Sequence, residues 1–131
     1  MNRLHTKGSL EPTSGSVTAN WNSGAATSGS AGADLVTIGA NDLTKILHTM
    51  IVSINALEAA ANVNVRMYMQ VNGTERRFDP GDTYIKGTDP HGLPVIESPL
   101  AIHEAVRVEV YSDNALDDAK AIAYDYLLEA R

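Results

Sequence analysis

The segment Asn62–Asn72, NVNVRMYMQVN, decides the fold class of this chain. Its apolar side chains occupy every second position and alternate with Asn64, Arg66, Tyr68 and Gln70, which is the two-residue period of a half-buried β-strand. A helix would scatter the same valines and methionines around its axis. The segment therefore predicts a strand with one face toward a core.

The residues that follow this strand predict a hairpin. Asn72-Gly73 is the dipeptide most typical of a two-residue type I′ turn, because both positions of that turn need a positive φ angle. Residues 74–78 then return as the partner strand.

The same two-residue period recurs on both sides of the hairpin. Residues 104–111 place three valines on one face and Arg107, Glu109 and Tyr111 on the other. Shorter strands are expected at residues 34–39, 93–96 and 100–102, and residues 56–61 are expected to form a loop or a single turn. A long strand is expected within residues 43–55, with one face made by Ile46, His48, Met50, Val52 and Ile54.

The C-terminal segment, residues 115–131, fits two patterns. A helical stripe runs through Leu116, Ala119, Ile122, Tyr126 and Ala130. A strand would instead place residues 122, 124, 126 and 128 on one face. We favour the strand because isoleucine and tyrosine have high β propensity and because the long neighbouring segments are strands; the helix remains the alternative.

Roughly seven to nine short strands, separated by Gly, Pro, Asn and Asp, predict an all-β domain over residues 34–131. The expected architecture is an antiparallel β-sandwich or a jelly-roll-like fold. Strands and helices do not alternate, which excludes Rossmann and P-loop folds.

Composition excludes several classes of function. The 131 residues carry a formal net charge of −6, whereas a nucleic-acid-binding protein needs a basic face to displace counterions. The absence of cysteine excludes disulfides and cysteine-ligated metals. Because no run of about 18 apolar residues occurs, no transmembrane helix is expected. The first residues lack the apolar core of a signal peptide, so we expect the protein in a cytosol unless a particle carries it out.

Residues 1–33 differ from the rest, because Gly, Ser, Thr and Ala dominate them from residue 8 onward. Such a stretch is either a flexible tail or an extended arm that becomes ordered on a neighbouring subunit or partner. The only tryptophan, Trp21, favours the arm, because a large aromatic side chain is costly to leave in water. Val17 and Ala19 alternate with polar residues before it, which predicts a short strand with Val17, Ala19 and Trp21 as partner contacts. We expect a chain without residues 1–33 to fold as a sandwich that no longer attaches.

No constellation of residues points to catalysis, a metal or a cofactor. The histidines lack metal-ligand spacing, and His48 is expected to be a satisfied core histidine. Asp79, Asp82 and Asp89 share a loop-rich region, where turn chemistry explains them as well as calcium binding does. We therefore expect a protein that is not an enzyme.

Three stretches together resemble small β-sandwich structural proteins of tailed bacteriophages, of the capsid decoration (cement) type. They are DLVTIGANDLTKILHTMIVSINAL, VNVRMYMQVNGTERRF and IHEAVRVEVYSDNALDDAKAIAYDYLLEAR, and the likeness covers residues 34–131. The resemblance implies a virion structural protein on the outer surface of the capsid, assembled in the host cytoplasm. It further implies a homotrimer that binds the major capsid protein and uses residues 1–33 as a lashing arm.

The alternative function is a fibre- or spike-like module that binds a carbohydrate or a receptor. Sugar-binding sandwiches present exposed aromatic rings, and Tyr68 and Tyr111 are the outward-facing candidates here.

Overall fold

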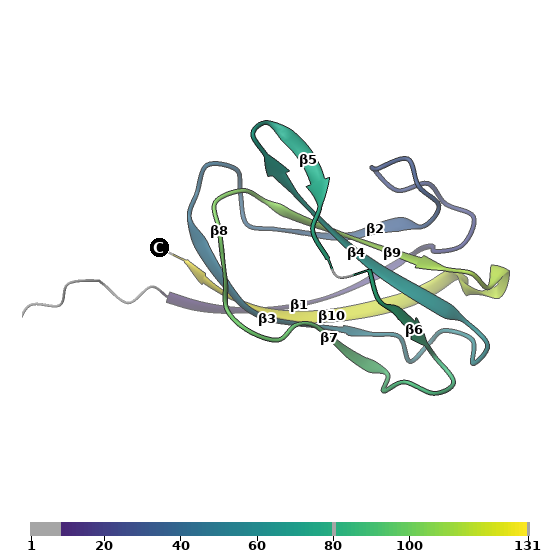
Figure 1. The fold of residues 1–131 in the computed structure, drawn as a ribbon. Coiled ribbons are helices and arrows are strands. Elements are labelled where there is room, and N and C mark those ends of the chain that lie inside the picture. Colours follow the sequence, from purple (N-terminus) through teal and green to yellow (C-terminus); the bar gives the residue numbers. More distant parts are fainter. Residues whose placement is uncertain (1–8, 80, 131) are drawn as a thin grey trace, which may run out of the picture.

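The computed structural model, which describes residues 9–79 and 81–130, is an all-β sandwich of two antiparallel sheets (Figure 1). Sheet I has the strand order β1 (Ser9–Asn20), β10 (Asp118–Ala130), β3 (Lys45–Ser53) and β7 (Gly92–Ile96), and β8 (Leu100–Ile102) also pairs with β3. Sheet II has the order β2 (Ala33–Ile38), β9 (Val106–Ser112), β4 (Asn62–Val71) and β5 (Thr74–Arg77), and β6 (Thr83–Ile85) also pairs with β4. The predicted all-β sandwich is confirmed.

The core lies between the sheets and is built from the alternation seen in the sequence. The inward valines of β9 are fully buried, as is Val63 of β4. Met50, Val52 and Ile54 approach them from the β3 side and are also fully buried. At about 1.5–3 kcal/mol for each buried aliphatic side chain, this interface is the main source of stability.

The predicted hairpin is confirmed. Val71 pairs with Thr74 across a two-residue loop, and both Asn72 (φ 51°) and Gly73 (φ 80°) have the positive φ angles of a type I′ turn. The tip of the β4–β5 hairpin projects away from the body of the sandwich (Figure 1), and Val71, beside the turn, is 57% exposed despite its place on the apolar face.

The C-terminal segment is a strand. A single 3-10 turn, Ala115–Asp117, precedes β10, which pairs with β1 on one side and β3 on the other. Ile122 and Leu128 face the core. Because both edges of β10 pair with a neighbouring strand, the helical alternative is wrong.

The expected face of the long strand in residues 43–55 is wrong at its start. In the β10 register Leu127 pairs with Thr49 and Leu128 with Leu47, so His48 is an extra residue in β3. This bulge reverses the alternation, and Leu47 is fully buried while His48 is half-buried and bonds Glu129 through Nε2, at 3.0 Å. His48 is therefore not a core histidine.

One strand was not expected. Residues 83–85, in the region read as loop, form β6 and pair with the first residues of β4. The three residues are too few for a visible alternation, so only their place beside β4 makes them a strand.

The expected boundary after residue 33 is corrected for the described residues. Ser9–Asn20 is a 12-residue strand that pairs with β10 from Ser9–Ala130 to Asn20–Asp118. Residues 9–33 are therefore part of the sandwich, and residues 1–8 of the expected arm lie outside the described residues. A chain without residues 1–33 would lose an edge strand of sheet I, so we no longer expect it to fold.

Trp21 follows β1 and lies inside the core, with no exposed surface. Its indole Nε1–H donates to the Lys120 carbonyl in β10, at 2.7 Å. Its own carbonyl accepts from the Ser112 N–H at the end of β9, at 3.0 Å. One residue thus connects both sheets at the point where the chain passes from sheet I to sheet II.

We predict that Trp21→Ala lowers the free energy of unfolding by about 3–5 kcal/mol, because it leaves a large cavity and an unpaired carbonyl. Urea unfolding followed by circular dichroism measures the change. Leu116→Ala is the matched control, since Leu116 is 68% exposed and should shift stability by less than about 0.5 kcal/mol. Equal midpoints for the two variants would contradict the burial of Trp21.

Candidate functional site

The Gly/Ser/Thr/Ala-rich residues 22–32 fold back onto the outer face of sheet II. An isolated bridge between Ala25 and Ala31 makes them a small hairpin of their own. Two glycines permit the close contact. A Cβ at Gly24 would lie 2.5 Å from the Asn20 carbonyl oxygen, and one at Gly32 would lie 2.4 Å from the Val110 carbonyl oxygen. The small side chains therefore allow this loop to lie flat against the molecule's own backbone.

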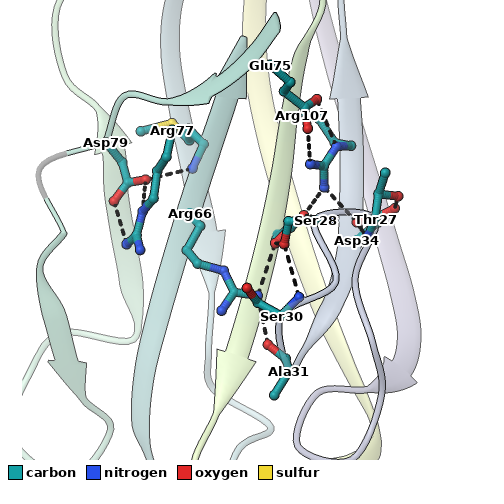
Figure 2. Close-up of polar contacts among 12 residues, drawn as sticks. Thr27, Ser28, Ser30, Ala31, Asp34, Arg66, Glu75, Arg77, Asp79 and Arg107 are labelled. Atoms are coloured by element: carbon teal, nitrogen blue, oxygen red, sulfur yellow. Dashed lines mark hydrogen bonds and ion pairs between the residues drawn. The ribbon is translucent and has the colours of Figure 1, made fainter.

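A buried carboxylate, Glu109, holds this loop to the sheet, and Figure 2 shows its partners Ser28, Arg66 and Arg107. It accepts from the Ser28 N–H at 3.1 Å and from the Ser28 hydroxyl at 2.8 Å. Arg66 approaches it from β4 at 3.0 Å, and Arg107 contacts it from its own strand. Arg66 also donates to the Ala31 carbonyl at 2.7 Å. Arg66, Arg107 and Glu109, which the sequence places on the solvent face, are thus buried beneath the loop.

Arg107 extends the network across sheet II. It pairs with Asp34 of β2 at 3.0 Å and with Glu75 of β5. Its guanidinium carbon also lies 4.6 Å from the centre of the Tyr68 ring, within the range of a cation–π contact. The network therefore joins β2, β9, β4 and β5 to the covering loop.

Several carboxylates of the sandwich are stabilised in their charged form. Burial acts to raise the pKa of Asp34, but the hydrogen bonds from Thr27 and the charge of Arg107 outweigh it and lower the pKa. The pKa of Asp79 is lowered in the same way. Burial acts to raise this pKa, but Arg77 and the hydrogen bonds from the N–H groups of Met67 and Gly81 lower it. These two groups stabilise the fold fully above their ordinary pKa, and the contribution is lost as the pH falls through the lowered value.

The cluster around Glu109 has a structural role. Glu109 receives bonds from a backbone N–H, a hydroxyl and two guanidinium groups. A carboxylate whose two oxygens are surrounded by donors in this way has no lone pair directed at a substrate. Its role is to fix the loop on sheet II.

The candidate partner contacts from the sequence have internal roles. Val17 and Ala19 are half-buried and pack against the core from β1, and Trp21 is fully buried. The three residues share one face, as predicted, but that face points inward. In the described structure these three residues therefore pack inside the chain, and their expected role as partner contacts is corrected.

Tyr68 and Tyr111 lie on the outer face of sheet II and are half-buried. In the register of β4 and β9, Tyr68 pairs with Arg107 and Tyr111 with Asn64, so their backbone positions are about 13 Å apart along the strands. The Glu109 cluster and its covering loop occupy the space between them. The two tyrosines do not form one aromatic platform.

The acidic side chains in the turns form local ion pairs and accept hydrogen bonds from backbone N–H groups. Asp79 pairs with Arg77 at 2.7 Å, and Asp89 accepts from the Ile85 N–H at 2.6 Å. Asp118 accepts from the N–H groups of Asn22 and Ser23. Within residues 9–79 and 81–130, no three His, Asp or Glu side chains are grouped closely enough to hold a metal ion.

The outer face of sheet I is the first candidate binding surface. Ile51 is 47% exposed in β3, and two shallow hollows of about 300 and 210 Å³ flank it. Ser14 of β1 and Asp125 of β10 line both hollows. Leu10, 51% exposed, adds a second apolar group at the start of β1. The described chain places no further strand beyond β1, so this face ends in an unpaired edge.

A groove of about 360 Å³ is the second candidate surface. It lies where the sandwich opens, between β4 and β6 of sheet II and the β7–β8 segment of sheet I. Its walls combine two aromatic side chains, prolines and aliphatics with two carboxylates. The lining includes Phe78, Asp82, Tyr84, Val95, Glu97 and Leu100.

Sequence reasoning missed both surfaces. A signal existed for Ile51, since the alternation in β3 places this apolar residue opposite Met50 and Val52. No local pattern in the sequence indicates the groove, because one wall comes from residues 78, 82 and 84 and the other from residues 94–100, and the two meet only in the folded chain.

Comparisons with protein-family models, curated proteins and solved structures find no match to this chain. In the part of the chain that the structure describes, no helix is long and apolar enough to cross a membrane.

We predict that Glu109→Gln destabilises the fold by about 3 kcal/mol, because it leaves two buried guanidinium groups without their shared counter-charge. Chemical unfolding measures the loss. Glu97→Gln, the same substitution at an exposed glutamate, should change stability by less than about 0.5 kcal/mol. A Glu109→Gln variant as stable as this control would show that the cluster does not hold the loop.

Proposed function

We propose that this chain is a virion structural protein, a capsid decoration (cement) protein that binds the major capsid protein through the outer face of sheet I. The observation that carries the proposal is the broad face around Ile51, with its two hollows and its unpaired β1 edge. A large, gently contoured surface suits a partner that is itself a large flat shell, whereas a small ligand needs an enclosed pocket.

The construction of the sandwich supports this proposal. The first and the last strands, β1 and β10, pair along their whole length, and the Glu109 cluster fixes the loop between β1 and β2. A cementing protein must resist deformation, and this closure ties the described N-terminal residues into the same rigid body as the docking face. The proposal also includes a trimer on the capsid surface, and this part of it rests on the resemblance.

The fibre- or spike-like carbohydrate-binding module has less support. This alternative rests on Tyr68 and Tyr111 as a pair of exposed rings. The Glu109 cluster and its covering loop separate the two rings. A sugar-binding platform needs neighbouring aromatic faces that are free to stack, and the Arg107 guanidinium already lies over the Tyr68 ring.

We predict that Ile51→Arg abolishes attachment to particles while leaving the fold stable, because Ile51 is exposed at the centre of the proposed face. The measurement is the amount of tagged chain that bands with virus particles in a density gradient, relative to the major shell protein. A ratio near one for the wild type indicates decoration, and a few copies per particle indicates a neck or fibre.

Leu116→Arg is the matched control, since it adds the same charge at an exposed leucine outside the sheets. It should band like the wild type. The proposed function is wrong if the wild-type chain does not band with particles. The proposed face is wrong if Ile51→Arg bands as well as Leu116→Arg.

A further inference from the structure

The groove between β6 and the β7–β8 segment is lined mainly by apolar and aromatic side chains, together with two carboxylates. Phe78 is 37% exposed, and Tyr84, Val95 and Leu100 are half-buried against the core. The free charges of the groove are the carboxylates of Asp82 and Glu97, both exposed. Neither carboxylate has an ion-pair partner among residues 9–79 and 81–130, and the nearby Arg77 is bound to Asp79 through two hydrogen bonds.

Tyr84 also lines the groove, beside these two carboxylates. Burial raises the pKa of the Tyr84 hydroxyl, and the charges of Asp82, Glu97, Asp79 and Asp89 raise it further. A positively charged group entering the groove would therefore meet an attractive potential and aromatic rings able to receive a cation.

A segment of matching chemistry exists in the chain itself. Residues 1–8, MNRLHTKG, contain Arg3 and Lys7, no acidic residue, and the apolar Met1 and Leu4. No other stretch of this length in the sequence joins two cations to apolar residues without an acid. Charge and apolar character are thus complementary between this segment and the groove.

We propose that the groove is an interface between copies of this chain and receives residues 1–8 of a second copy. The cationic residues of that segment lie against the two carboxylates, and its apolar residues lie against the aromatic wall.

The position of β1 favours a second copy over the same chain. β1 begins at Ser9 on one edge of sheet I, and the groove opens at the opposite edge, beyond β10 and β3. Residues 1–8 of the same chain would have to reverse direction and cross about 15 Å of sheet first. A contact in which one surface of each copy binds a different surface of the next is heterologous, and such contacts form a ring where the rotation between copies closes and an open filament where it does not. The contact therefore gives a route to a trimer that does not depend on binding to a capsid.

The experiment measures the molar mass of the full-length chain by light scattering over a range of protein and salt concentrations. The wild type should associate, and salt should weaken the association. Arg3→Glu/Lys7→Glu should raise the dissociation constant at least about tenfold, because like charges then face each other. Asp82→Lys/Glu97→Lys should do the same, and mixing these two variants should restore association.

Asp42→Lys is the matched control, since it reverses an exposed acid in the turn before β3, away from the groove and from the proposed docking face, and should associate like the wild type. Urea midpoints for every variant establish that the fold is intact. A wild type that stays monomeric at all concentrations would overturn the proposal, including the case in which the segment binds its own groove. Association that persists in both double variants would overturn it too. Loss of particle binding with association unchanged would instead separate the proposed function from this interface.

Discussion

The burial of Trp21 between the two sheets is the constraint on which the rest of the structure depends. The residue stands where the chain leaves sheet I for sheet II, and it bonds both sheets: β10 through its indole N–H and β9 through its carbonyl. Its ring is among the largest fully buried side chains. With Trp21 in the core, β1 must lie along β10, and residues 22–32 must leave the core across the outer face of sheet II.

That path explains the unusual composition of the N-terminal quarter of the chain. A loop lying directly on a sheet needs small side chains, and Gly24 and Gly32 stand where a Cβ would meet backbone oxygens. It also needs partners for its polar groups, which Glu109 and Arg66 supply from the sheet. A segment rich in Gly, Ser, Thr and Ala would be flexible in isolation. In this protein the same composition allows the segment to be held against its own domain. The same closure leaves the outer face of sheet I and the acidic groove as the open surfaces.

The sequence predicts those parts of the fold that depend on local pattern. Alternation over residues 62–72 and 104–111 identifies β4 and β9, and Asn72-Gly73 identifies the hairpin turn. The rest depends on contacts between distant residues. The partner of β1 is more than a hundred residues away, so its low-complexity sequence reads as an arm. The bulge at His48 is set by the register of β3 against β10, and the extra residue reverses the side chains that precede it in β3. The groove walls likewise meet only after folding.

Amide hydrogen exchange across residues 9–20 tests most directly whether the N-terminal segment belongs to the sandwich. If β1 is an integral strand closed by Trp21, its hydrogen-bonded amides are protected to the same level as those of β10 and β4, because they open only with the whole domain. Exchange of the β1 amides at the rate of an unstructured peptide, while β3, β4 and β9 stay protected, would contradict this and make the segment a separate arm.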